Sequence, residues 1–348
     1  MSAREQHRPA GSSPLIEVRN LSVRFGPVLA VDDLSFHLAL GEGLGIVGES
    51  GCGKSATARA IMGLHRGDPR CQVTGKVLLD GVDLVTRSDR QMQKVRGRRI
   101  AMIFQDPLTC LNPLQRIGTQ IAETLQTHTG LSSAAIRVRT IELLQLVGIP
   151  QPRERVNAFP HQFSGGMRQR VTIALAIACD PALLIADEPT TALDVTTQMQ
   201  ILRLLADLRV RTGMGLILIT HDFGVVAEVA DRILVMYAGQ CVESGRTGKI
   251  FRTPQHPYTA GLLASIPSVD MPRLPRLPSI RGSPPSPAVH RPTGCSFRPR
   301  CDLGQDRCIN PPPLVNDSKG PEHLTRCWFP GSASKAPNTL PPDAAEAT

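Results

Sequence analysis

Eight consecutive residues form a loop whose composition suits the binding of phosphate groups. The loop is made of Gly48, Glu49, Ser50, Gly51, Cys52, Gly53, Lys54 and Ser55. Glycines let successive backbone N–H groups turn inward around phosphate oxygens, and a helix that follows adds its positive end. Lys54 is expected to reach the outer phosphates of a nucleoside triphosphate, and Ser55 to bind the accompanying Mg²⁺. The loop matches G-x-x-x-x-G-K-S/T in full and therefore predicts such a site.

Two adjacent carboxylates end a strongly apolar run further along the chain. Asp187 and Glu188 follow residues 183–186, which read as a buried strand. Side chains alternate at the tip of a strand, so the two acids are expected to point in different directions. Asp187 can then hold Mg²⁺, while Glu188 faces the water that attacks the outer phosphate. A pair of acids at a strand end is a weak signal alone, and the upstream loop makes the catalytic interpretation the better one.

Composition limits the classes of protein that the chain can represent. Its 348 residues leave room for about two domains. No apolar run approaches the about 18 residues of a membrane span, and residues 1–14 are polar and lack the apolar centre of a signal peptide. These features predict a cytosolic protein. Its nine cysteines are then expected to be core residues, metal ligands or reactive thiols. Within the loop, Cys52 is either a small neutral residue or a redox-sensitive thiol.

The net charge of +9 is concentrated in part of the chain. One basic segment contains Arg87, Arg90, Lys94, Arg96, Arg98 and Arg99. Such a segment can meet nucleic acid or anionic lipid, and it can equally be a solvated face of a basic protein.

Hydrophobic patterning predicts the elements that must position the motifs. Alternation over residues 15–25 and 30–38 is typical of half-buried antiparallel strands. Four continuous apolar runs are typical of buried parallel strands: residues 43–47, 183–187, 216–220 and 233–236. Helices are expected at three places: residues 55–64, residues 132–147, and after Asp194, where Val195, Met199, Leu202 and Leu205 share a face. This order predicts an α/β phosphate-binding-loop (P-loop) domain with helices inserted at about residues 110–170.

Proline marks the domain boundaries. Of the 30 prolines, 19 lie between Pro254 and Pro342. We therefore expect a compact body over residues 15–250 and a loop-rich extension over 251–329. Disordered tails are expected at 1–14 and 330–348.

A third motif makes the chain similar to a known family, the ABC-transporter ATPases. The motif consists of Ser164, Gly165, Gly166, Met167, Arg168 and Gln169, and it resembles the family's signature sequence. The resemblance implies a P-loop NTPase cassette with a RecA-like core, an antiparallel β subdomain and a helical signature subdomain. It also implies that ATP and Mg²⁺ are bound, with Lys54, Ser55 and Asp187 among the residues that hold them.

Further residues match the other family motifs. Asp194 matches the D-loop, His221 the switch histidine that contacts the γ-phosphate, and Gln105 the Q-loop, which reaches Mg²⁺ and links ATP to the transmembrane partner. Phe25 stands where the family places an aromatic ring on adenine, although an aromatic residue at a strand end is often a core residue. The signature and D-loop are implied to bind the ATP that is held by a second cassette.

The extension narrows the resemblance. Residues 255–259 and 261–267, together with 104–113 and 163–170, resemble the oligopeptide and dipeptide importer ATPases. The implied function is ATP-driven uptake of peptides, performed by a peripheral subunit at the cytoplasmic face of the membrane. The implied partners are a second, non-identical ATPase, two transmembrane permease subunits and an extracytoplasmic solute-binding protein, with no nucleic acid. Related importers move nickel or glutathione, which leaves these as alternative cargoes.

A soluble nucleic-acid-associated ABC ATPase is a weaker alternative. Such proteins carry two cassettes in one chain, or separate the P-loop from the signature by a long coiled coil. Here one cassette is present, and Lys54 and Ser164 are 110 residues apart. A catalytically idle cassette is disfavoured because Lys54, Gln105, Glu188 and His221 are all present.

Four cysteines cluster in the proline-rich extension, at Cys295, Cys301, Cys308 and Cys327. Four such residues in a segment with little core of its own suggest a metal staple. Some peptide-importer ATPases that resemble this chain carry a 4Fe–4S cluster here, and four thiolates also suit zinc. The spacing lacks the paired cysteines usual for zinc. Free thiols or a disulfide remain the other interpretation.

Overall fold

The computed structural model describes residues 13–106, 110–191, 193–266, 279–285, 293–316 and 323–332. The expected tails at 1–14 and 330–348 lie almost entirely outside these ranges. So do residues 107–109 of the segment after Gln105, Ala192 of the D-loop, and Pro267.

The described residues alternate strands and helices through most of the chain. The strands are β1 (Ile16–Phe25), β2 (Val28–Leu38), β3 (Gly43–Val47), β4 (Cys71–Leu79), β5 (Val82–Asp83), β6 (Ile100–Ile103), β7 (Leu183–Asp187), β8 (Gly215–Thr220), β9 (Arg232–Tyr237), β10 (Gln240–Arg246), β11 (Val315–Asn316) and β12 (Leu324–Thr325). The α-helices are α1 (Lys54–Ile61), α2 (Asp89–Gln93), α4 (Ile117–His128), α5 (Ser133–Leu146), α6 (Pro152–Arg155), α7 (Gly165–Ile177), α8 (Val195–Thr212), α9 (Phe223–Ala227), α10 (Thr247–Arg252) and α11 (Pro257–Ala264). The 3₁₀ segments are η1 (Pro160–Gln162), η2 (Arg298–Arg300) and η3 (Asp306–Ile309).

These strands form two sheets. The smaller sheet has the order β2-β1-β4-β5 and is antiparallel, as the alternating patterns predict. The larger sheet has the order β11-β12-β10-β9-β3-β8-β7-β6, and β9, β3, β8, β7 and β6 run parallel. Parallel strands end at the same edge of a sheet, so the loops after β3, β7 and β8 meet there. The predicted α/β fold is confirmed.

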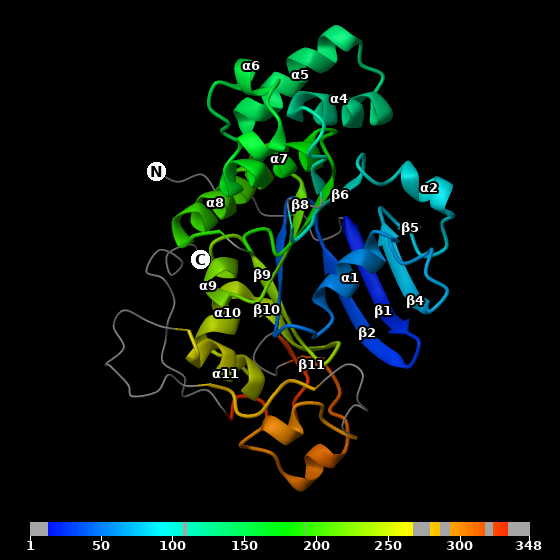
Figure 1. Ribbon diagram of the computed structural model, residues 1–348. Helices are drawn as coiled ribbons and strands as arrows, with labels where there is room; N and C mark the ends of the chain where they lie inside the picture. The colour runs from blue at the N-terminus through cyan, green and yellow to red at the C-terminus, as the bar shows by residue number, and fades with distance from the viewer. Residues whose placement is uncertain are drawn as a thin grey trace.

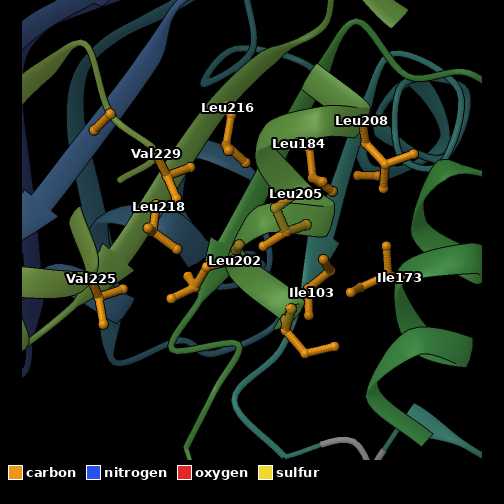
Figure 2. Close-up of a cluster of buried hydrophobic side chains, with 14 of the residues drawn as sticks. Ile103, Ile173, Leu184, Leu202, Leu205, Leu208, Leu216, Leu218, Val225 and Val229 are labelled. Atoms are coloured by element: carbon orange, nitrogen blue, oxygen red, sulfur yellow. The ribbon is translucent and has the colours of Figure 1, made fainter. Parts of the chain in front are cut away.

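The main core lies between the large sheet and the helices that cover it. Figure 2 shows Leu202, Leu205 and Leu208 of α8 beside Leu184 of β7 and Leu216 of β8. All five side chains are at most 1% exposed. Continuous apolar strands therefore have helices against them, as parallel sheets require.

The face of α8 that carries Val195, Met199, Leu202 and Leu205 is buried only in part. Val195 is 77% exposed, and Met199 is only partly buried. Asp194 caps the helix as expected, through the backbone N–H of Thr197. Full burial begins at Ile201, so the first turns of α8 extend beyond the part that packs on the sheet.

A helical layer is inserted between β6 and β7, where residues 110–170 predict it. Figure 1 shows α4, α5, α6 and α7 grouped at one end of the molecule, with the small sheet beside α1. Helix α5 begins after its cap, Ser132, and buries Ile136, Thr140, Leu143 and Leu144 at helical spacing. Within the described ranges, no helix has both the length and the apolar composition needed to cross a membrane.

The basic segment is partly used inside the fold. Arg96 donates to the backbone oxygens of Met62 (2.9 Å) and Gly63 (2.8 Å), and Arg99 pairs with Asp80. These two arginines hold the segment against the end of α1 and the small sheet. Arg90, Lys94 and Arg98 of the same segment are exposed.

The extension is built onto the large sheet. Strand β12 pairs antiparallel with β10, through Glu243 opposite Thr325 and Ser244 opposite Leu324. Figure 1 shows the extension at the end of the molecule opposite the helical layer. Its strands therefore continue the sheet of the cassette.

Candidate active site

The nucleotide-binding loop connects β3 to α1 and is shaped by its glycines. Gly53 has φ 104°, and a Cβ there would collide with the carbonyl oxygen of Ala30, so the position requires glycine. Helix α1 starts directly at Lys54, with its N-terminus facing the loop. The Lys54 ammonium is buried and donates to the backbone oxygens of Gly48 (2.6 Å) and Glu49 (3.0 Å). The loop therefore orients the lysine through its own carbonyl groups.

Ser55 and Asp187 meet as the sequence predicts. The Ser55 hydroxyl donates to Asp187 Oδ1 at 3.0 Å, across 132 residues of chain. Burial raises the pKa of Asp187 above its usual range, although the hydrogen bond from Ser55 lowers it. A hydroxyl beside a carboxylate at the end of a phosphate-binding loop is a donor set that suits Mg²⁺, which prefers oxygen ligands.

Glu188 lies at the centre of a second group of side chains. Its backbone has φ 48°, a left-handed conformation that is uncommon outside glycine, and its N–H donates to the Ile219 oxygen of β8 at 2.9 Å. Its carboxylate accepts from Gln105 Nε2 at 3.0 Å and lies 3.6 Å from His221 Nδ1. The glutamate is largely buried while the histidine is exposed. The structure thus brings the three predicted residues together.

Thr191 belongs to the same group, and the sequence reasoning missed it. Its hydroxyl donates to Glu188 Oε2 at 3.2 Å and to the Glu188 backbone oxygen at 3.2 Å. Its place three residues after Glu188, where a turn follows the strand, was the available signal.

The signature residues begin helix α7. Ser164 caps the helix by accepting from the Met167 N–H at 3.4 Å, and both Ser164 and Gly165 are exposed. Arg168 donates to the Pro160 oxygen at 3.0 Å. Gln169 is 1% exposed and faces the interior, so its side chain supports the helix from within. The exposed edge of the motif is therefore its first two residues.

The other residues predicted to contact nucleotide are packed against, or bonded to, residues of this chain. Asp194 accepts from Thr197 N (2.9 Å) and from Thr197 Oγ1 (2.7 Å). Phe25 ends β1, and its ring meets His65 edge-on at 4.9 Å. Cys52 is 5% exposed, and burial raises the pKa of its thiol, which opposes a redox-sensing role.

The four clustered cysteines line one cavity in the extension. Cys295, Cys301, Cys308 and Cys327 all line this cavity, beside Phe297 and Trp328. Among the residues that the structure describes, no three His, Cys, Asp or Glu side chains are arranged to hold a metal ion. The donors suit a metal, but their present arrangement does not fit one, so the predicted iron–sulfur cluster and the zinc alternative are unsupported.

Burial also favours the protonated form of three of these thiols. It raises the pKa of Cys295 and Cys301, and that of Cys327 to about 11. Metal binding would have to displace these protons.

Comparisons with known proteins show the family to which the chain belongs. A family model described as ABC transporter matches residues 31–191, and one described as oligopeptide/dipeptide transporter, C-terminal region, matches residues 242–308. The oligopeptide transport ATP-binding protein OppD of Bacillus subtilis is 49% identical over 96% of this chain and 93% of its own length. The dipeptide transport ATP-binding protein DppD of Haemophilus influenzae is 52% identical over 87% of this chain and 92% of its own.

Solved structures show the same fold in the body. A dimeric bacterial ABC transporter cassette, MJ0796, superimposes with a TM-score of 0.59 at 28% identity, and the match covers 67% of this chain and 98% of that one. CbiO1 of Clostridium perfringens, part of an ABC transporter complex, gives a TM-score of 0.61 at 25% identity over 69% of this chain and 91% of its own.

The fold and the site define a nucleotide-hydrolysing cassette, in which a phosphate-binding loop, a strand-end carboxylate pair and a helix-capping signature occur once each. The chain belongs to the ABC transporter family, in the branch of the oligopeptide and dipeptide transport ATP-binding proteins. It is an ATPase of that family.

Proposed function

We propose that this chain is the ATP-hydrolysing subunit of an importer of di- and oligopeptides. The observation that carries the proposal is the meeting of the Ser55–Asp187 pair with the Gln105–Glu188–His221 group, in a chain whose extension matches the peptide-transporter C-terminal region. The first feature supports ATP hydrolysis, and the second supports peptides as the class of cargo.

Each residue of the site has a role that follows from its place. Lys54 and the N–H groups of the loop bind the phosphates of ATP, with Phe25 against adenine. Ser55, Asp187 and Gln105 hold Mg²⁺, which when bound neutralises charge on the β- and γ-phosphates.

Glu188 accepts the proton of the attacking water, and Gln105 and Thr191 hold its carboxylate in place. His221 is exposed beside Glu188 and contacts the γ-phosphate.

A second cassette completes the ATP site in this proposal. The exposed Ser164 and Gly165 begin helix α7, and a helix N-terminus presents unpaired N–H groups to an anion. These residues, together with Asp194, contact the ATP that is held by the partner. The dimeric state of the related solved cassette supports this arrangement. The partner is proposed to be a second, non-identical ATPase, as the resemblance to the peptide importers implies.

Two permease subunits and an extracytoplasmic solute-binding protein are the other proposed partners, which places the chain at the cytoplasmic face of the membrane as a peripheral subunit. A structural feature supports a docking surface. Leu114 follows the Q-loop and is 85% exposed, and Val138 of α5 is 57% exposed. Exposed apolar side chains in the segment that follows Gln105 suit a contact with a permease subunit.

The four cysteines are proposed as one unit whose donors suit a 4Fe–4S cluster, or zinc as the second choice. Their convergence on one cavity supports this. Purification without oxygen, followed by iron and zinc analysis and a visible spectrum, tests it. A colourless, metal-free protein would remove the cluster from the account.

Uptake by cells that lack this chain tests the proposed cargo. The strain is compared with one carrying the chain on a plasmid, and labelled tripeptide, labelled glutathione and radioactive nickel are supplied in parallel. Loss of tripeptide uptake, restored by the plasmid, is the expected result. Normal tripeptide uptake together with lost nickel or glutathione uptake would replace peptides by that cargo.

A further inference from the structure

Glu49 lies in the nucleotide-binding loop, and its carbonyl oxygen, its N–H group and its carboxylate all make hydrogen bonds. Its carbonyl oxygen accepts from Lys54 Nζ at 3.0 Å. Its N–H donates to the Tyr258 hydroxyl at 2.9 Å, and its carboxylate accepts two bonds from Arg300, at 2.6 and 2.9 Å. Tyr258 and Arg300 belong to the extension, 209 and 251 residues away along the chain. One loop residue therefore joins the phosphate-binding lysine to the extension.

Arg300 is fixed on all sides. It is 5% exposed, its Nε donates to the Arg281 oxygen at 2.9 Å, and its guanidinium lies 5.8 Å from the ring centre of Tyr237 and 6.0 Å from that of Phe297. The two hydrogen bonds to Glu49 raise the pKa of Arg300, so it stays charged. A two-bond pair between a guanidinium and a carboxylate has a set geometry, and breaking it leaves a buried charge without its partner.

We propose that Arg300 is a positioning residue for ATP binding. Held by Arg300 at its carboxylate and by Tyr258 at its N–H, Glu49 keeps the loop carbonyl that orients the Lys54 ammonium in place. The extension is thus a structural part of the ATP site. This role goes beyond the ATPase and transport functions assigned above, and its readout is nucleotide affinity, which does not depend on the cargo.

The hydrogen-bond partners of Arg300 support a positioning role over a role in stability alone. Both terminal nitrogens of the Arg300 guanidinium donate to the Glu49 carboxylate of the loop, while its Nε donates to the Arg281 oxygen of the extension. Cys301 follows it directly, so the same arginine also joins the loop to the cysteine cavity.

The test measures the dissociation constant of a non-hydrolysable ATP analogue for the full chain, in the presence of Mg²⁺. Arg300→Met is expected to weaken binding by about tenfold or more, because both charged hydrogen bonds are lost. Arg300→Lys keeps the charge without the fork and is expected to restore part of the affinity. Arg298→Met, at an exposed arginine in the same 3₁₀ segment, is the matched control and should bind as the parent does.

A double-mutant cycle with Glu49→Gln separates positioning from stability. If the pair acts as a unit, the double variant binds no more weakly than either single variant. In the assembled transporter, the KM for ATP should rise more than kcat falls. A folded Arg300→Met protein with unchanged affinity, or additive effects in the cycle, would overturn the proposal.

A milder variant covers the case in which Arg300→Met does not fold. Tyr258→Phe keeps the ring and removes the hydroxyl that accepts from the Glu49 N–H. We expect its affinity for the analogue to fall by about threefold or more. Parental affinity in both Tyr258→Phe and Glu49→Gln would also contradict the proposal.

Discussion

The guanidinium of Arg300 and the carboxylate of Glu49 form a two-bond ion pair that joins the extension to the nucleotide-binding loop. The arginine is buried, and the glutamate is partly shielded. The body and the extension also share a sheet, through β10 and β12. The proline-rich segment is therefore joined to the large sheet by backbone pairing and to the nucleotide-binding loop by a charged side-chain contact.

Asp187 is expected to make the protein less stable at neutral pH than an uncharged residue would. Burial raises the pKa of this carboxyl in the folded state. The folded state then holds its proton to a higher pH than the unfolded state does, so the free energy of unfolding falls as pH rises from the ordinary pKa to the raised one. Asp187→Asn does not titrate and should have the higher Tm at pH 7, without Mg²⁺ or nucleotide.

Thermal unfolding of both proteins between pH 3 and 8 checks this. The advantage of Asp187→Asn should vanish at the acid end and grow across mildly acidic pH. The same variant should lose Mg²⁺-dependent hydrolysis. A Tm at pH 7 below that of the parent would contradict the assignment of burial as the dominant effect.

Leu114→Asp is expected to uncouple the cassette from its permease. The side chain is exposed, so the variant should fold and hydrolyse ATP as an isolated chain like the parent. In the assembled transporter, stimulation of hydrolysis by the loaded binding protein should fall by about tenfold, because a buried charge would enter the proposed contact. Val210→Asp, at an exposed apolar residue of α8, is the control. Equal stimulation in all three proteins would remove Leu114 from the contact.

Glu243→Gln should loosen the extension. The buried carboxylate accepts from the N–H groups of Gln255 (2.7 Å) and His256 (2.9 Å), and lies 2.7 Å from His323 Nε2. An amide cannot accept at both ends, so a buried donor loses its partner at a cost of about 1–3 kcal/mol.

The single tryptophan, Trp328, lies in the extension and reports on its unfolding. In urea, its fluorescence transition should come at a lower concentration for Glu243→Gln than for the parent. Glu228→Gln, at an exposed glutamate, should behave as the parent. Coincident transitions for all three proteins would show that Glu243 does not anchor the extension.

Cys327 should react slowly with iodoacetamide in metal-free protein. Only the thiolate attacks, and burial raises the pKa of Cys327 to about 11, so little thiolate forms at pH 8. Cys110 is exposed and serves as the internal comparison. Peptide mapping after timed labelling should find Cys110 modified first, with labelling of Cys327 accelerating towards pH 11. Equal rates at pH 8 would contradict the burial of this thiol.

Local patterns predicted the elements and much of the site. Period-2 and continuous apolar runs identified the two kinds of sheet, because the number of buried faces determines those patterns. The contacts of Ser55 with Asp187 and of Gln105 with Glu188 follow from motifs at the same edge of one sheet.

Other features depend on tertiary contacts that no local pattern encodes. The exposure of Val195 reflects where α8 leaves the sheet, and the burial of Gln169 reflects the packing of α7. The pairing of Arg300 with Glu49 joins residues 251 apart, so neither position alone indicates it. Sequence spacing predicted that the four cysteines belong together, and all four line one cavity, but spacing alone does not give their arrangement there.

The central claim is that hydrolysis at this site drives peptide uptake, and Glu188→Gln tests it most directly. The transporter is reconstituted in liposomes with parental or variant chain, and binding of ATP, its hydrolysis and accumulation of labelled peptide are measured together. The account predicts that the variant keeps ATP binding, because the amide retains its contacts. Hydrolysis should fall by about a hundredfold or more, since an amide cannot accept the proton from water, and peptide accumulation should fall with it. Parental hydrolysis and accumulation in the variant would contradict the account.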